Sequence, residues 1–304
     1  MELCEERGAD TKRLHSQFQR PKINRVTGGS APGSDLGVTN MPYKKRQLGN
    51  GEIYHITARR IGNELLFGDE HDYYRGIFSI YEFNNRKHVS IRDRREQRAA
   101  FKKQGAPPRG QTSGTSGKVV EDDKREKLVE VLAFALMPNH IHLLVRQLVD
   151  NGVSRFMQKM GSGYAAYFKE KYNQKGLKGH FFQGRFNAVH IEDDGQLKTV
   201  LVYIFTNPVA LIEPGWKERG VASIEKSIVF LEQKYRWSSY WDCLGKKNFP
   251  SIIEKEKDFV LEALGGQEGC KKAVDQWIKY KGELRKLLAK VFDIKEMRQL
   301  EYLD

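Results

Sequence analysis

The sequence has few cysteines and lacks long apolar runs. Its three cysteines are odd in number and widely separated, so they give neither a disulfide framework nor the spacing of zinc ligands. They are Cys4, Cys243 and Cys270. No apolar run approaches the roughly 20 residues that a membrane-spanning helix needs, and the N-terminal residues are too polar for an export signal. We therefore expect a cytoplasmic protein with reduced thiols and no membrane partner.

Acidic residues are outnumbered by basic ones. The 304 residues include 39 Asp and Glu against 52 Lys and Arg, which gives a net charge of +13 and a pI of about 9.5. So basic a chain predicts a polyanionic partner, with nucleic acid ahead of a membrane surface, and hence a nucleoid-associated protein. A solvated basic face is the alternative. The hydrophobic content of 39% is sufficient for a packed core.

Three segments are expected to lie outside the catalytic core. Residues 1–40 hold few apolar side chains and a run rich in glycine and serine, which predicts a flexible tail. Residues 84–118 carry ten Lys and Arg against two acids, which predicts a basic insertion that ends near residue 127. This insertion either follows DNA phosphates or is a solvated spacer. Residues 246–304 are predicted to form a helical extension, either an accessory DNA-binding module or a stabilising cap.

No phosphate-binding loop is found. Residues 114–118 are similar to one, but Thr112 replaces the first glycine, Val119 replaces the Ser or Thr, and no strand precedes them. We therefore expect no nucleotide cofactor.

Between residues 41 and 245 the hydrophobic pattern alternates between the periods of strands and helices. The order is strand, helix, strand, strand, helix, strand, helix, which predicts an α+β fold: a ferredoxin-like antiparallel sheet with helices packed on one face. The expected strands are 52–59, 129–136, 140–146 and 186–191, and the expected helices begin near Asp69, Val153 and Asp193.

Two histidines follow a predicted tight turn at Pro138-Asn139. His140 and His142 are two apart on a predicted strand, so their side chains point to the same face. Two imidazoles held side by side make half of a divalent-metal site. The alternative is a partly buried, hydrogen-bonded histidine pair.

A tyrosine and an asparagine are four residues apart on the last predicted helix. Tyr203 and Asn207 would therefore share one helix face, although Pro208 biases the residue before it away from helical geometry. If this helix packs beside the histidine strand, two imidazoles, an amide carbonyl and a phenol converge. Such a donor set suits Mg²⁺ or Mn²⁺, with positions left for phosphate oxygens.

These motifs resemble those of the HUH-type single-tyrosine transposases of insertion sequences, especially the REP-associated tyrosine transposases. The resemblance covers about residues 43–241, and Val202 stands where the family usually has an arginine. The matching segments are 54–57 (YHIT), 137–145 (MPNHIHLLV), 183–186 (QGRF), 203–209 (YIFTNPV) and 237–240 (WSSY).

The resemblance implies that residues 41–245 form a HUH catalytic domain. His140, His142 and Asn207 would bind the divalent metal, and Tyr203 would attack a phosphate of single-stranded DNA near a hairpin. The products would be a 5′-phosphotyrosine and a free 3′-hydroxyl, and reversal would rejoin the strand. The sequence leaves open whether the protein works as a monomer or as a homodimer. The expected DNA-binding residues are Arg185, Gln183 and Arg146, with a surface salt bridge as the alternative role of Arg185.

Two other functions stay open. A transposase-derived protein could bind DNA hairpins without cleaving them. A metal-dependent hydrolase could use water as the nucleophile, but it needs a general base near the metal. No carboxylate adjoins His140 or His142 in the sequence, so Glu192 or Asp193 would have to approach in three dimensions.

Overall fold

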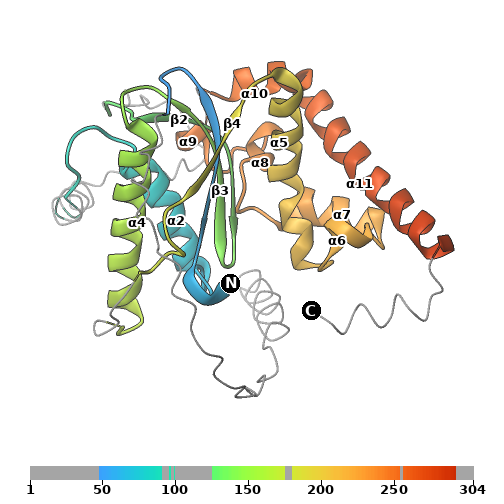
Figure 1. The fold of residues 1–304 in the computed structure, drawn as a ribbon, viewed down its shortest axis with the longest axis horizontal. Helices are drawn as coiled ribbons and strands as arrows, with labels where there is room; N and C mark the ends of the chain where they lie inside the picture. Colours follow the sequence, from blue (N-terminus) through green and yellow to red (C-terminus); the bar gives the residue numbers. More distant parts are fainter. Residues whose placement is uncertain are drawn as a thin grey trace, which may run out of the picture. The chain divides into compact units, whose positions relative to one another are not determined.

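The computed structural model describes residues 48–90, 96, 99, 125–174, 180–253 and 256–291 (Figure 1). The predicted tail, most of the predicted insertion and the last 13 residues of the predicted extension lie outside the described residues. The described residues all belong to one compact unit. The predicted division of the chain at residue 245 stays a prediction. No helix in the described ranges is long and apolar enough to cross a membrane.

A four-stranded antiparallel sheet lies at the centre of this unit, with the strand order β2-β3-β1-β4 (Figure 1). Because β3 inserts between β1 and β2, this is the split β-α-β order of a ferredoxin-like sheet, and the predicted fold class is confirmed. The strands are β1 (Ile53–Arg59), β2 (Val129–Met137), β3 (His140–Gln147) and β4 (Asn187–Ile191).

Helices lie on both sides of the sheet. As expected, α2 (Glu70–Glu82) and α4 (Gly152–Lys171) share one face, and Gly76 of α2 lies over Leu136 of β2. The prediction that the helices pack on one face is wrong for α5 (Asp194–Thr206), which covers the opposite face (Figure 1), where Asn207 reaches His142 of β3. The face under α5 is therefore the face that carries the two histidines.

The C-terminal helices pack against α5 and the structure that follows it. After α5 come η3 (Asn207–Leu211), α6 (Trp216–Arg219), α7 (Ile224–Val229), η4 (Phe230–Lys234), α8 (Tyr240–Cys243), α9 (Pro250–Ile253), α10 (Lys257–Leu264) and α11 (Gly266–Val291). The long helix α11 contacts α5, α6, α7 and α10. Cys243 and Cys270 are buried and unbridged.

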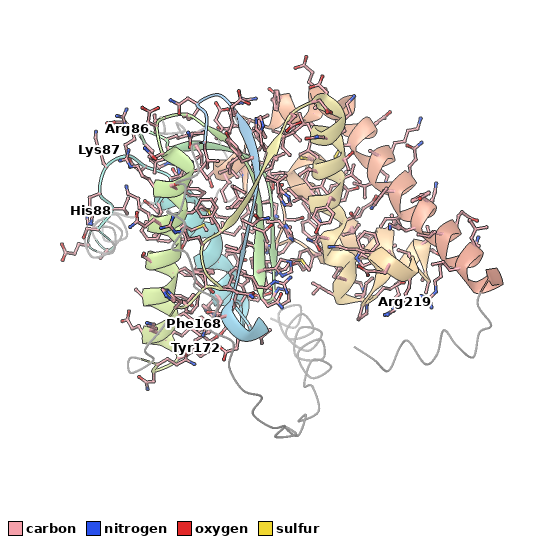
Figure 2. All side chains as sticks on the ribbon, viewed as in Figure 1. Arg86, Lys87, His88, Phe168, Tyr172 and Arg219 are labelled. Carbon is pink, nitrogen blue, oxygen red and sulfur yellow. The ribbon has the colours of Figure 1, made fainter. Side chains whose placement is uncertain are left out.

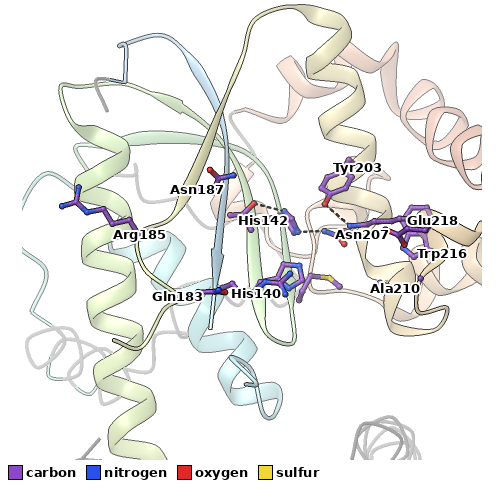
Figure 3. Close-up of a pocket in the computed structure, with 15 residues that line it drawn as sticks. His140, His142, Gln183, Arg185, Asn187, Tyr203, Asn207, Ala210, Trp216 and Glu218 are labelled. Carbon is purple, nitrogen blue, oxygen red and sulfur yellow. Dashed lines mark hydrogen bonds between the residues drawn. The ribbon is translucent and has the colours of Figure 1, made fainter. Parts of the chain in front are cut away.

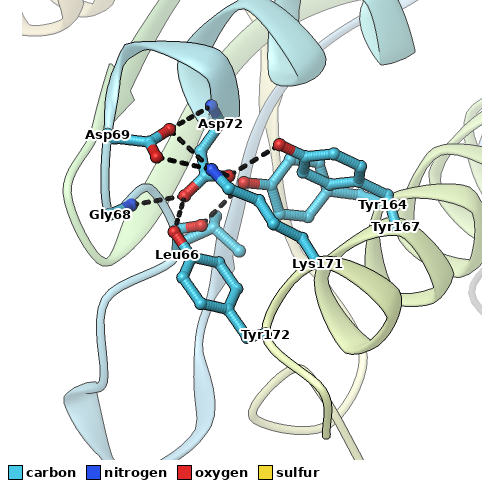
Figure 4. Close-up of polar contacts among 8 residues, drawn as sticks. All are labelled: Leu66, Gly68, Asp69, Asp72, Tyr164, Tyr167, Lys171 and Tyr172. Atoms are coloured by element: carbon cyan, nitrogen blue, oxygen red, sulfur yellow. Dashed lines mark hydrogen bonds and ion pairs between the residues drawn. The ribbon is translucent and has the colours of Figure 1, made fainter. Parts of the chain in front are cut away.

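A buried carboxylate ties α2 to α4. Asp72 is fully buried and accepts hydrogen bonds from the hydroxyls of Tyr167 (2.8 Å) and Tyr172 (2.6 Å) (Figure 4). Lys171 completes the set with an ion pair of 2.7 Å. Burial, followed by the hydrogen bond to Asp72, raises the pKa of Tyr167 to about 12. These contacts fix the start of α2 against the end of α4 and satisfy a charge that would be costly to bury alone.

The predicted insertion leaves the fold beside α4. Lys159 of α4 donates to the main-chain oxygens of Asn85 (2.5 Å) and Lys87 (2.7 Å). Figure 2 shows Lys87 on the α4 side of the molecule and Arg219 of α6 on the other side. The described start of the insertion therefore lies on the opposite side of the sheet from α6.

Candidate active site

A pocket of about 510 Å³ opens on the face of the sheet that α5 covers (Figure 3). Strands β1 and β3, the segment before β4, and the run from α5 to α6 all contribute to its wall. The lining residues are Thr57, Arg59, Met137, His140, His142, Gln183, Arg185, Asn187, Tyr203, Asn207, Ala210, Gly215, Trp216, Lys217 and Glu218.

The two predicted histidines point into this pocket together. His140 is half-buried, His142 is buried, and their ring centroids are 4.8 Å apart. Burial, with the nearby charges of Arg59 and Lys217, lowers the pKa of His140 to about 3. Burial also holds the pKa of His142 well below its usual value. Both imidazoles are therefore neutral at pH 7, which is the form that binds a metal ion.

Hydrogen bonds define the tautomer of His142. The side-chain amide nitrogen of Asn207 donates to Nε2 of His142. Because Nε2 accepts, the ring proton lies on Nδ1, which is 3.0 Å from Nε2 of His55 and donates to it. Burial, followed by the charge of Lys217, lowers the pKa of His55 to about 4, so His55 is a neutral acceptor at pH 7. His55 thus holds the ring of His142 with Nε2 toward the pocket.

Asn207 keeps its helical relation to Tyr203 despite the proline that follows. Its φ and ψ are −51° and −38°, and its N–H donates to the main-chain oxygen of Tyr203. Pro208 lies at the start of the 3₁₀ turn η3, where a missing N–H costs nothing. The backbone at Asn207 therefore stays helical before the proline, and Tyr203 and Asn207 share one face as the four-residue spacing predicts.

The phenol of Tyr203 faces the histidines. Its ring is edge-on to His142, with centroids 5.5 Å apart, and edge-on to His55 at 5.8 Å. Nζ of Lys217 donates to the Tyr203 hydroxyl at 2.9 Å. Sequence reasoning missed Lys217 because it lies 14 residues further on, in a short helix with no motif. Sequence reasoning also left the role of His55 open. The strand pairing provides the signal: Thr57 of β1 pairs with His142, and His55 lies on the same face of β1 as Thr57.

The three predicted DNA-binding residues lie in different places. Gln183 and Arg185 line the pocket, and the guanidinium of Arg185 points away from Tyr203 (Figure 3). Arg146 does not line it: this residue is six positions along β3 from His140, about 20 Å away, and forms an ion pair of 2.5 Å with Glu130.

One carboxylate does line the pocket. It is Glu218 of α6, which sequence reasoning did not consider. Neither Glu192 nor Asp193 lines the pocket, and the Asp193 side chain instead caps α5 by accepting from the N–H of Gln196 at 2.8 Å.

The donor set fits a divalent metal only with help from an amide. Across the described ranges, no three His, Cys, Asp or Glu side chains are grouped so that they could hold a metal ion. His140 and His142 offer two neutral imidazoles, and the amide nitrogen of Asn207 touches Nε2 of His142. To bind a metal beside Nε2, the amide would have to turn so that its oxygen replaces the nitrogen. Two imidazole nitrogens with an amide oxygen leave coordination positions for phosphate oxygens, which suits Mg²⁺ or Mn²⁺.

Comparisons with known proteins agree with the resemblance seen in the sequence. Residues 109–207 match the family model described as "Transposase IS200 like". This stretch contains β2, β3, α4, β4 and α5, with His140, His142, Tyr203 and Asn207. A solved structure of a REP-associated tyrosine transposase bound to a REP hairpin is 14% identical, with a TM-score of 0.37, and the match covers 69% of this chain and 88% of that one. Among curated proteins, no match is found. The family match confirms the resemblance to IS200-like transposases over residues 109–207.

Proposed function

We propose that this protein is a transposase-like DNA transesterase that cleaves and rejoins single-stranded DNA near hairpins through a 5′-phosphotyrosine. One observation carries the proposal. The Tyr203 hydroxyl shares a pocket with His140, His142 and Asn207, and all four residues lie in the stretch that matches the transposase family. A phenol beside a candidate metal site on such a scaffold is the arrangement that covalent phosphodiester chemistry requires.

The reaction is a transesterification. The phenol loses its proton to solvent, and the oxygen of Tyr203 forms a bond to the phosphorus as the bond from phosphorus to the 3′-oxygen breaks. The 3′-oxygen leaves with the electron pair and takes a proton from solvent. The phosphotyrosine ester retains the energy of the broken bond, so reversal rejoins the strand without a nucleotide cofactor.

The pocket residues divide the work between them. His140, His142 and Asn207 would hold Mg²⁺ or Mn²⁺, which supplies Lewis-acid stabilisation worth several kcal/mol when bound. His55 keeps Nε2 of His142 unprotonated and directed at the pocket. Arg59 lines the same pocket and adds positive charge for the phosphate.

The proposed DNA contacts extend beyond the pocket. Gln183 and Arg185 would contact the strand beside the scissile phosphate. Arg146 lies further along β3 and is paired with Glu130 of β2, so it would contact DNA only outside the pocket. The net charge of +13 supports a DNA partner and an association with the nucleoid. Because one chain contributes the phenol and both histidines, a single copy suffices for the chemistry, whether the protein is a monomer or a homodimer.

One observation favours a second candidate, a hydrolase in which water attacks. Glu218 lines the pocket and would be the general base. This reaction would release a free 5′-phosphate, and it would depend on Glu218 and not on Tyr203.

Trapping of the covalent intermediate tests the proposal. The protein is incubated with Mn²⁺ and a labelled DNA hairpin that carries single-stranded flanks, and is then denatured. We expect a labelled protein–DNA adduct with the wild type and with Tyr280→Phe, an exposed tyrosine on α11, but not with Tyr203→Phe. Equal behaviour of wild type and Tyr203→Phe would favour the non-cleaving hairpin-binding protein. If the wild type releases DNA with a free 5′-phosphate and Glu218→Gln does not, the hydrolase is favoured.

A further inference from the structure

We propose that Lys217 is a catalytic residue that stabilises the negative charge on the Tyr203 oxygen, and that α11 holds it in place. This inference rests on the proposed function, because it assigns the cation that makes the phenol an effective nucleophile. It also gives the C-terminal helix a part in the chemistry, although α11 lies outside the stretch that matches the transposase family.

The contact between Lys217 and Tyr203 is direct and specific. Nζ lies 2.9 Å from the hydroxyl and 4.4 Å from the centroid of the ring. Residue 202 is valine, so the neighbour of the nucleophile in the chain brings no charge. Arg59 lines the pocket too, and the Tyr203 hydroxyl accepts a hydrogen bond from Lys217.

The short helix α6 is pinned at both ends. Gly215 precedes it with φ +73° and Gly220 follows it with φ +75°, a left-handed backbone that favours glycine at each end. Trp216, the first residue of α6, is buried. The position of Lys217 is therefore set by the packing of α6 and not by a flexible loop.

Helix α11 supplies that packing. Nζ of Lys281 donates to the main-chain oxygen of Lys217 at 2.5 Å, and the main-chain oxygen of Lys281 accepts from the N–H of Val221 at 3.1 Å. A Cβ atom on Gly220 would collide with this same oxygen of Lys281, so the end of α6 lies directly against α11. Lys281 of α11 thus forms hydrogen bonds with Lys217, before Gly220, and with Val221, after it.

The physical role follows from the charge that develops in the reaction. A phenol is almost fully protonated at neutral pH and is a weak nucleophile, so negative charge must accumulate on its oxygen before and during attack. A positioned ammonium group stabilises that charge without moving, and it works best where burial excludes water. The proton of Tyr203 goes to solvent, the electron pair of its oxygen forms the new bond to phosphorus, and Lys217 exchanges no proton in this step.

The experiment compares Lys217→Met, Lys217→Arg and Lys198→Met, a control at an exposed position on α5. Two rates are measured on the full chain. The first is single-turnover formation of the Tyr203–DNA adduct with Mn²⁺ and saturating hairpin DNA. The second is acetylation of Tyr203 by N-acetylimidazole in the absence of DNA and metal, followed by peptide mass spectrometry.

We expect Lys217→Met to slow adduct formation about 100-fold or more, as loss of one electrostatic stabiliser does elsewhere, and to slow acetylation as well. Lys217→Arg should restore most of both rates, and Lys198→Met should match the wild type. Lys281→Met, which removes the bond to the Lys217 main chain, should slow adduct formation about tenfold, whereas Lys279→Met, exposed on the same helix, should not.

Wild-type rates for Lys217→Met in both assays would overturn the inference. A slower adduct that is explained by weaker DNA binding, with acetylation unchanged, would also overturn it, because Lys217 would then only tether phosphate. If the wild type forms no adduct while acetylation still depends on Lys217, the proposed function fails and the pairing of Lys217 with Tyr203 stands.

Discussion

Lowering the pH from 7 to 5 should destabilise the metal-free protein through its buried histidines. The pKa of His55 falls from 6.5 to about 4 and that of His140 to about 3, while the pKa of His142 lies well below 6.5. Between pH 6.5 and these lowered values, the unfolded chain binds protons that the folded chain does not. Stability is therefore full above pH 6.5 and is lost as the pH falls through this window.

The size of the loss follows from the same values. At pH 5, a histidine with an unfolded pKa of 6.5 and a folded pKa of 4 or less costs about 2 kcal/mol relative to pH 7. His55 and His140 would together cost about 4 kcal/mol, and His142 adds to this loss in the same direction. The loss is a large part of the whole stability of many domains, roughly 5–15 kcal/mol. Asp242 offsets part of this loss, because burial raises its pKa to about 6 and the folded protein gains a proton there as the pH falls. The histidines still lower the stability of the protein between pH 7 and pH 5.

Urea unfolding in EDTA, followed by circular dichroism at pH 7 and pH 5, measures this loss. His55→Gln removes one of these histidines. Between pH 7 and pH 5 this variant should therefore lose about 2 kcal/mol less free energy of unfolding than the wild type loses. His71→Gln, at an exposed position in α2, should leave the difference unchanged. Equal pH dependence in the wild type and His55→Gln would refute the reasoning.

Two further variants test the network and the candidate metal set. Asp72→Ala leaves Lys171 without its buried partner and two phenols without an acceptor, so it should lower the free energy of unfolding by about 3 kcal/mol. The control Glu70→Ala, at an exposed position, should change the free energy of unfolding by less than about 0.5 kcal/mol. Chemical denaturation measures both variants, and equal losses would contradict the role of Asp72. Asn207→Ala should weaken Mn²⁺ binding by at least about tenfold in calorimetry, because an oxygen donor is lost. Asn187→Ala, in the same pocket, should leave Mn²⁺ binding unchanged. Unchanged Mn²⁺ affinity in Asn207→Ala would remove this residue from the proposed ligand set.

Local patterns in the sequence predict much of the sheet and of the candidate site. The two-residue period places His140 and His142 on one face, and the four-residue spacing places Tyr203 and Asn207 on one face, because both relations depend only on backbone geometry. The pocket then requires one tertiary contact, the packing of α5 across β3, which the family resemblance implies.

The residues missed by sequence reasoning reach the site through packing between distant segments. Lys217 reaches Tyr203 because α11 holds α6 in place, and no spacing in the sequence encodes that contact. Arg146 was predicted to contact DNA, but in the structure it is paired with a carboxylate. A regular β2–β3 hairpin would place Val131 opposite Arg146, but the register shifts between Val131 and Ala133, so Glu130 faces Arg146 instead.

The most direct test of the central claim is mass spectrometry of the peptide that contains Tyr203 after reaction with hairpin DNA and Mn²⁺. We predict a nucleotide joined through its 5′-phosphate to the oxygen of Tyr203, together with a DNA fragment that ends in a free 3′-hydroxyl. DNA cleaved to a free 5′-phosphate, with Tyr203 unmodified at every time point, would contradict it.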